Sequence, residues 1–194
     1  AALGGRTTFL AHQAHPVIAQ ALTGCAHALV VMNVPEGASP EEDAQASARA
    51  LGTQCDWLVV DHYGLDNRWE SSLRGHVPRV MVIDDLADRR HDCDILVDPG
   101  YGRELADYAD LVPPTADLLL GTRFALLKST FAERHDAAPL YVEHPRVHVF
   151  FGSGAAAERW LAQYCEWLLA AFPGMCLCAV GRGPHNRFVA RAGA

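Results

Sequence analysis

The stretch that decides the fold is Trp57-Leu58-Val59-Val60-Asp61-His62-Tyr63-Gly64, in which four apolar residues run directly into a polar turn. A short, fully apolar run of this kind is typical of a strand buried inside a parallel sheet. Polar residues directly after such a strand lie at its carboxyl end, which is where ligands bind in open α/β sheets. The stretch therefore predicts both a parallel sheet and the edge that carries a site.

Similar apolar runs occur on both sides of this strand and alternate with helical patterns. Ser39-Pro40-Glu41-Glu42 predicts a helix start, with Ser39 as N-cap and Glu42 closing a capping box, and Gly52 ends that helix. Further strands are expected at 7–10, 27–32, 80–83, 95–97, 147–151 and 175–180, and further helices at 16–24, 66–74, 124–134 and 155–172. The alternation predicts an α/β fold, a parallel sheet with helices on both faces.

The chain is acidic, with 16 Lys+Arg against 23 Asp+Glu among its 194 residues and a formal net charge of −7. This balance argues against a nucleic-acid partner, because the phosphate backbone attracts basic surfaces. No apolar run approaches the roughly 20 residues that cross a bilayer, and no signal peptide is visible. We therefore expect a cytoplasmic protein with no nucleic-acid or membrane partner; its oligomeric state stays open.

The sequence predicts a linker at a segment that is bounded by prolines. We expect an N-terminal α/β domain at 1–138, a linker at 139–145 and the start of a second α/β domain at 146–194. The second domain is too short to close a sheet of its own, and the first opens without a polar lead-in. Both ends therefore predict a fragment of a longer protein.

The cysteines do not form a metal-binding pattern. No CxxC pair occurs, whereas zinc sites use thiolates or histidines at tight, repeated spacings. Cys176-x-Cys178 alternates along an expected strand, which is typical of buried thiols in a reducing compartment. We expect no metal and no cofactor.

Three polar clusters follow expected strands. Asp61, His62 and Tyr63 bring an acid, an imidazole and a phenol together, groups that bind sugar hydroxyls or transfer protons; the alternative is a simple turn closed by Asp61 and Gly64. Asp84 and Asp85 form a second cluster. Two adjacent carboxylates can hold Mg²⁺, but neighbours in a strand point to opposite faces, so turn capping and a salt-bridged loop are favoured.

The third cluster is the glycine turn Gly152-Ser153-Gly154, between an expected strand and an expected helix. Backbone N–H groups at such a turn face anions such as a diphosphate, although a tight packing turn explains it equally well. The turn matches neither a Walker loop nor a dinucleotide fingerprint. A separate pair, His12-x-x-His15, has no third residue that could complete a metal site. We therefore expect these histidine side chains to be solvated.

Five ordered blocks resemble one known family. They are Val60-Asp61-His62-Tyr63-Gly64-Leu65-Asp66, Val82-Ile83-Asp84-Asp85-Leu86-Ala87-Asp88-Arg89, His91-Asp92-Cys93-Asp94-Ile95-Leu96, Tyr108-Ala109-Asp110-Leu111-Val112-Pro113 and Leu120-Gly121-Thr122-Arg123-Phe124-Ala125-Leu126-Leu127. The family is PseG, the UDP-2,4-diacetamido-2,4,6-trideoxy-β-L-altropyranose hydrolases of pseudaminic acid biosynthesis, which serves flagellin glycosylation. A weaker match extends over nearly the whole chain.

The resemblance implies a two-domain, GT-B-like fold with a UDP-sugar substrate. Water attacks the anomeric carbon, UDP leaves and the configuration inverts, without metal or cofactor. By position, Tyr63 matches a motif tyrosine near the sugar, with Asp61 and His62 in the same block. Asp84 and Asp85 match the acidic strand end, and the turn at 152–154 matches the glycine turn that opens the second domain.

The chain departs from the family pattern at several of these positions. Lys128 stands where Arg is typical, and Lys cannot replace a bidentate Arg fork. The catalytic histidine that the resemblance implies would precede residue 1. The alternative to a hydrolase is therefore an inactive fragment, or a weak sugar-nucleotide-binding module, of the same family, and we expect the isolated chain to be inactive.

Overall fold

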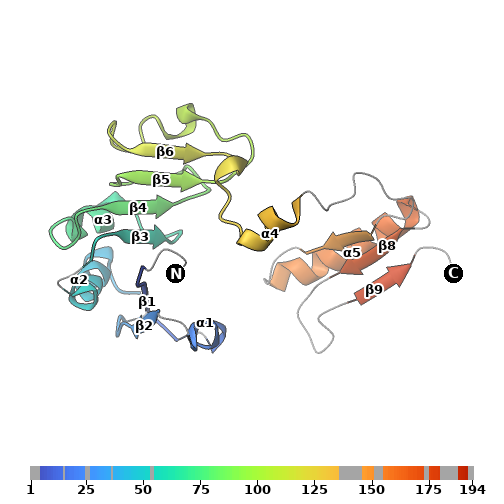
Figure 1. The fold of residues 1–194 in the computed structure, drawn as a ribbon, viewed down its shortest axis with the longest axis horizontal. Coiled ribbons are helices and arrows are strands. Elements are labelled where there is room, and N and C mark those ends of the chain that lie inside the picture. The colour runs from blue at the N-terminus through green and yellow to red at the C-terminus, as the bar shows by residue number, and fades with distance from the viewer. Residues whose placement is uncertain are drawn as a thin grey trace. The chain divides into compact units, whose positions relative to one another are not determined.

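A computed structural model describes residues 5–14, 16–24, 27–35, 37–52, 55–135, 146–150, 155–172, 175–179 and 188–191. The chain divides into two compact units, Ala1–Leu127 and Lys128–Ala194, which are considered separately below. Figure 1 shows the elements of both units. The expected linker at 139–145 lies outside the described residues.

Unit 1 is built on a four-stranded parallel sheet. Its strands run in the order β3 (Leu58–Asp61), β4 (Val80–Ile83), β5 (Ile95–Asp98) and β6 (Asp117–Leu120), and their arrows point the same way in Figure 1. A second parallel pair joins β1 (Thr8–Ala11) to β2 (Ala28–Val31). The expected parallel α/β architecture is confirmed.

Unit 1 has three α-helices among its described residues, and two of them begin at a side-chain cap. They are α1 (Pro16–Leu22), α2 (Pro40–Leu51) and α3 (Asn67–Leu73). The capping box of α2 is confirmed: Ser39 Oγ accepts from the Glu42 N–H at 3.2 Å, and the Ser39 N–H donates to Glu42 Oε2 at 2.8 Å. Asp66 caps α3 by accepting from the Arg68 N–H at 3.0 Å.

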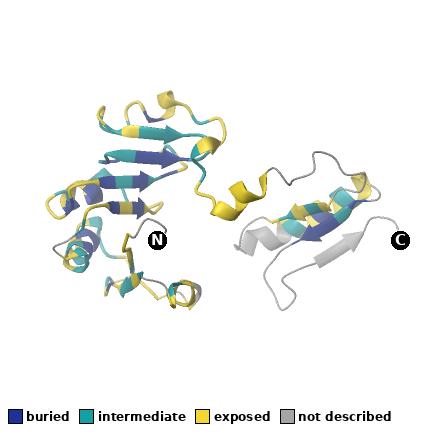
Figure 2. Ribbon diagram, viewed as in Figure 1, coloured by how far each residue is buried: buried dark blue, intermediate teal, exposed yellow. Residues whose placement is uncertain are grey.

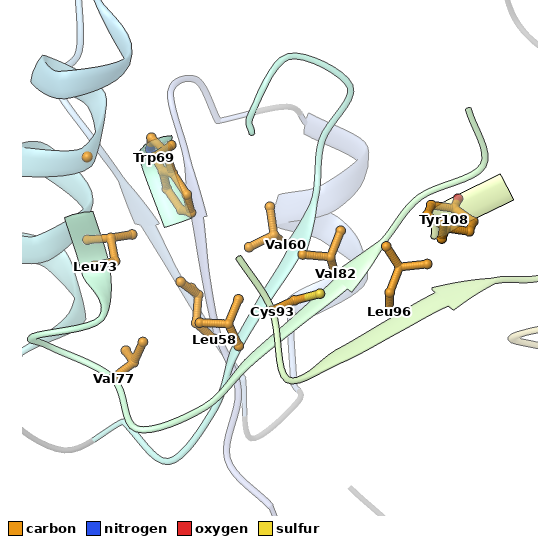
Figure 3. Close-up of a cluster of buried hydrophobic side chains, with 11 residues drawn as sticks. Leu58, Val60, Trp69, Leu73, Val77, Val82, Cys93, Leu96 and Tyr108 are labelled. Atoms are coloured by element: carbon orange, nitrogen blue, oxygen red, sulfur yellow. The ribbon is translucent and has the colours of Figure 1, made fainter. Parts of the chain in front are cut away.

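The core of unit 1 lies between the sheet and the helices α2 and α3 (Figure 3). In β3, Leu58 and Val60 are buried while Val59 between them is 53% exposed, the period-two pattern of a strand with one covered face. Figure 2 shows that burial is deepest along β4 and β5. Burial raises the pKa of the Cys93 thiol to about 12, so this cysteine stays protonated and acts as a core residue.

The helix expected at 124–134 is confirmed only at Ser129–Glu133. The structure has a 3-10 turn, η2 (Thr122–Phe124), then an extended backbone, and then the short α4 (Ser129–Glu133). Leu126 and Leu127 are 68% and 66% exposed. The apolar face that the helical periodicity predicted therefore does not pack against a core. Because short helices depend on packing of such a face, the residues between η2 and α4 stay extended.

In its described residues, unit 2 combines two helices, the short α4 and a longer one, with a mixed sheet. Its strands are β7 (Arg146–Val149), β8 (Cys176–Ala179) and β9 (Phe188–Arg191), with β7 and β8 parallel and β9 antiparallel to β8. The helix α5 (Ala155–Ala171) follows β7, as expected. Leu177 and Cys178 on β8 are buried, which confirms the buried strand expected there. Both units are thus α/β, consistent with a GT-B-like fold.

Among the described residues, no helix combines the length and the apolar character that a membrane crossing requires.

Leu96 tests the core, because it lies fully buried in the middle of β5. We expect Leu96→Ala to lower the free energy of unfolding by about 2–5 kcal/mol through lost burial and a residual cavity. Urea denaturation followed by circular dichroism measures the change. Leu126→Ala is the control, since its exposed side chain predicts little change; equal losses for the two variants would contradict this core.

Candidate functional site

The candidate site lies at the carboxyl edge of the four-stranded sheet. β3 ends at Asp61, β4 is followed directly by Asp84, and β5 ends at Asp98. Because these strands are parallel neighbours, their carboxyl ends meet at one edge of the sheet. Three carboxylates from three consecutive strands therefore gather where α/β proteins bind ligands.

Asp84 is a buried anion with three partners. Its Oδ2 accepts from the Ala87 N–H at 2.9 Å and from the Tyr108 hydroxyl at 2.9 Å, and its Oδ1 pairs with Arg89 Nη1 at 2.9 Å. Burial favours the neutral acid, but these hydrogen bonds and the Arg89 charge outweigh it and hold the pKa of Asp84 below its usual value. Asp84 therefore stays ionised inside the fold.

Tyr108 links the ends of two strands. It closes the 3-10 turn η1 (Leu105–Tyr108) and is fully buried, with its hydroxyl 2.9 Å from Asp84 Oδ2 and 2.8 Å from Asp98 Oδ2. Burial, together with the hydrogen bonds to the two carboxylates, raises the pKa of Tyr108, so the phenol keeps its proton. Tyr108 thus has one hydroxyl proton to share between two carboxylates. The negative charge that remains on these carboxylates requires cations nearby.

Two arginines supply those cations and also hold the loops at the edge. Arg103 Nε lies 2.5 Å from Asp98 Oδ2, while Arg103 Nη2 donates to the Asp85 carbonyl at 2.6 Å. Arg89 pairs with Asp84 and donates to the carbonyls of His62 at 3.0 Å and Leu65 at 2.9 Å. The buried charge cluster is therefore connected to the backbone on which the candidate side chains sit.

Tyr63 and Asp85, both expected from the sequence, are brought together by these loops. The Tyr63 hydroxyl lies 3.5 Å from Asp85 Oδ2, a long contact between two exposed side chains. Tyr63 is 69% exposed although it is a large aromatic residue. A phenol and a carboxylate facing solvent offer one donor and several acceptors, which suits a ligand rich in hydroxyl and amide groups.

His62 and Asp61 lie beside this pair with different surroundings. His62 Nδ1 accepts from the Gly64 N–H at 3.0 Å and so closes the turn after β3. A Cβ at position 64 would come within 3.2 Å of the His62 ring, so a larger residue there would require the ring to shift. Asp61 is exposed at the end of β3. The turn that the sequence attributes to Asp61 and Gly64 is therefore formed by His62 and Gly64.

The remaining expected residues belong to unit 2 or lie outside the described residues. Lys128 belongs to unit 2, where it is exposed and precedes α4 at its N-cap position. Gly152, Ser153 and Gly154 lie outside the described residues. Unit 1 alone therefore supplies the geometry of the candidate site.

A second buried pair anchors α3 below the edge. Glu70 accepts from His91 Nδ1 at 2.7 Å and from the Asp92 N–H at 2.6 Å, and both side chains of the Glu70–His91 pair are fully buried. This pair joins α3 to the segment that follows β4. Sequence reasoning gave roles neither to this pair nor to Tyr108, Asp98 and Arg103, although polar residues at strand ends were a usable signal for Asp98.

A groove of about 550 Å³ opens beside the edge strand β6. Its lining combines apolar side chains, Leu105, Leu118, Leu120 and Phe124, with the guanidinium groups of Arg103 and Arg123. Since Arg103 also contacts the Asp85 backbone, this groove adjoins the loop that carries Asp85.

The carboxylates at the edge do not form a metal cage. Asp84 is occupied by Arg89 and Tyr108, while Asp85 next to it is exposed and contacts Tyr63. Within the described part of the chain, no group of three or more histidine, cysteine or acidic side chains is arranged to hold a metal ion. What the edge offers is hydrogen-bonding groups on fixed loops.

No family model matches the chain, and a search of the curated proteins gave no match.

Asp84→Asn tests whether the buried cluster holds unit 1 together. Removing one partner of a buried ion pair predicts a loss of about 3–5 kcal/mol in the free energy of unfolding at pH 7. Because the folded pKa of Asp84 is depressed, its contribution is present above the unfolded value of about 3.9 and is lost as pH falls through the folded value. Urea denaturation from pH 7 down to pH 2 should therefore show a shallower acid loss in the variant.

Asp88→Asn is the matched control, because Asp88 pairs with the same Arg89 but its side chain is 58% exposed. It should change stability little. Equal effects of the two substitutions would contradict the special role of Asp84.

Arg89→Lys tests whether the guanidinium fork fixes the loop after β3. Lysine keeps the charge but cannot pair with Asp84 and reach both loop carbonyls at once. We expect faster amide hydrogen exchange at 62–66 in the variant, with less change in the buried strands β4 and β5. Unchanged exchange in this loop, measured by mass spectrometry, would contradict the clamp.

Proposed function

We propose that the chain belongs to a UDP-sugar hydrolase that cleaves the anomeric C–O bond of a UDP-linked diacetamido-trideoxy sugar and releases UDP. The observation that carries the proposal is the Tyr63–Asp85 pair, which faces solvent at the carboxyl edge on loops fixed by Arg89 and Arg103. The likeness of five sequence blocks to the pseudaminic acid hydrolases supplies the substrate class. The product would enter nonulosonic acid synthesis.

The edge provides the groups that such a reaction needs for orienting its substrate. The Tyr63 hydroxyl donates to an acceptor on the sugar, and the Asp85 carboxylate accepts from a hydroxyl or an acetamido N–H. Asp61 and His62 extend this surface along the end of β3. UDP is a good leaving group, so positioning of the sugar and of the attacking water accounts for much of the catalysis.

Asp84 was expected to bind substrate, and we assign it a different role. Its side chain is fully buried and its partners are Tyr108, Ala87 and Arg89. A carboxylate in that position holds the loop that carries Asp85 rather than contacting the sugar. Tyr63 remains the proposed catalytic residue of this edge.

A second candidate function is a sugar-nucleotide-binding module without hydrolysis. Lys128 is the observation that favours it. An arginine is typical at this position of the family pattern, and a lysine cannot bind an anionic group with two parallel hydrogen bonds as arginine does. This candidate predicts that UDP-sugar binds in calorimetry while no UDP is released.

Release of UDP from the diacetamido-altropyranose substrate by the full-length protein tests the proposal. Tyr63→Phe should lower kcat/KM by about 10²-fold, since it removes the hydroxyl that we propose donates to the sugar. Tyr101→Phe is the control, because Tyr101 also follows a strand of this sheet and is 96% exposed. It should retain activity. Full activity of Tyr63→Phe would remove Tyr63 from the site, and an inactive wild-type protein that still binds the substrate would favour the module.

A further inference from the structure

The groove beside the edge strand β6 has a floor that unit 1 holds in place. Leu118 and Leu120 lie two positions apart on β6, so their side chains share one face of the strand, and both also pack against the core of unit 1. Leu105, from the turn η1, adds an apolar side chain that is 68% exposed. The volume of about 550 Å³ is that of a small-molecule site. The groove is therefore a fixed apolar surface that is open to solvent.

Arg123 brings to this groove a positive charge that is available for a ligand. Its guanidinium carbon lies 4.6 Å from the centre of the Phe124 ring, and both residues line the groove. Among the described residues, no carboxylate forms an ion pair with Arg123. Stacking on an aromatic ring orients a guanidinium but does not use its N–H donors. The side chain therefore presents an oriented set of donors beside an apolar floor.

Arg103 is the second cation of the lining, and it connects the groove to the carboxyl edge of the sheet. Its Nη2 donates to the Asp85 carbonyl at 2.6 Å, and its Nε lies 2.5 Å from Asp98 Oδ2. Its Nη1 lies 3.8 Å from Asp107 Oδ2, which is beyond hydrogen-bond distance. Because Arg103 contacts the Asp85 backbone, a molecule in the groove lies next to the loop that carries Asp85.

The charges around the groove determine which kind of anion it can accept. The charge of Arg103 is offset by Asp98, which leaves Arg123 to bind a ligand. Glu104 also lines the groove, is exposed, and repels a second negative charge. A guanidinium binds a carboxylate through two parallel hydrogen bonds. The lining thus favours a singly charged carboxylate over a doubly charged phosphate.

We propose that this groove is a binding site for a small carboxylate with an apolar body. The carboxylate accepts two hydrogen bonds from Arg123, and the apolar body covers Leu105, Leu118 and Leu120. The ligand is a molecule other than the substrate proposed above, and the site does not depend on the proposed hydrolysis. Through Arg103, the ligand also contacts the group that holds the Asp85 loop.

Titration of the full chain with 4-phenylbutyrate tests the site. Amide chemical shifts of the isotope-labelled protein report where the probe binds, and 4-phenylbutanamide is its neutral match in shape. We expect saturable shifts at 103–106 and 118–124, with a Kd of about 1 mM or below for the carboxylate. The amide should bind about tenfold more weakly, because it cannot form hydrogen bonds that are assisted by its own charge.

Three exposed side chains allow the groove to be changed without disturbing the core. Arg123→Gln should weaken 4-phenylbutyrate binding about tenfold, and Leu105→Ala about threefold through lost apolar contact. Glu104→Gln should tighten binding about twofold, because it removes a repelling charge. Arg49→Gln is the matched control: Arg49 is an exposed arginine in the last turn of α2, away from the groove lining, and its loss should leave the Kd unchanged.

The outcomes are clear-cut. Binding that stays within twofold of wild type in Arg123→Gln, or an amide that binds as tightly as the carboxylate, would overturn the proposal, because the guanidinium then contributes nothing. So would the absence of saturable shifts at the groove residues up to about 10 mM probe. Tighter binding of phenyl phosphate than of 4-phenylbutyrate would show that the site takes phosphate esters and would overturn the assignment of a carboxylate. None of these measurements uses UDP release, so this site and the proposed hydrolysis can fail separately.

Discussion

The hydroxyl of Tyr108, held between the carboxylates of Asp84 and Asp98, is the contact on which the carboxyl edge depends. Two buried anions at neighbouring strand ends repel each other and lose their hydration, so the arrangement is stable only with a shared donor and with cations close by. Arg89 and Arg103 are those cations. The N–H groups of these arginines that do not contact the carboxylates donate to loop carbonyls. The two arginines therefore neutralise the buried charge and also fix the loops of Tyr63 and Asp85.

The same principle, a buried carboxylate that orients an imidazole, occurs twice in unit 1 with different consequences. Glu70 and His91 are both fully buried, so this pair can only join α3 to the segment after β4. Asp43 is buried, but His12 is half exposed and lies beyond the end of a strand. The two pairs therefore differ in the exposure of the imidazole, which is half open to solvent in one and enclosed by the fold in the other.

Local signals in the sequence predicted the parts of the structure that depend on local interactions. The capping box at Ser39 and the apolar run before Asp61 were sufficient for α2 and β3, because their stabilising groups are close in sequence. β6 was not expected: it has only three apolar residues, and its pairing with β5 defines it as a strand. The helix expected at 124–134 forms only at 129–133, because Leu126 and Leu127 before it are exposed and do not pack against a core.

The residues of the candidate site also differ in whether local sequence signals predict them. Tyr63 and Asp85 could be expected because each closely follows an apolar strand, and the parallel sheet brings such positions to one edge. His12, just after β1, pairs with Asp43 in α2 across 31 positions of sequence, so neither residue predicts the other. From the sequence, Tyr108 in its short helical turn cannot be distinguished from an ordinary core aromatic residue. Its role depends on two strand ends that the fold brings together around its hydroxyl.

The most direct test of this account is to map where the sugar of the proposed substrate contacts the protein. Amide chemical shifts of the isotope-labelled protein would be compared between saturating UDP and saturating UDP-sugar, so that the difference reports the sugar alone. The account predicts that the differences concentrate at 61–65 and 84–86, the two loops held by Arg89 and Arg103. Differences confined to other parts of the chain, with these two loops unchanged, would contradict the assignment of the carboxyl edge as the site.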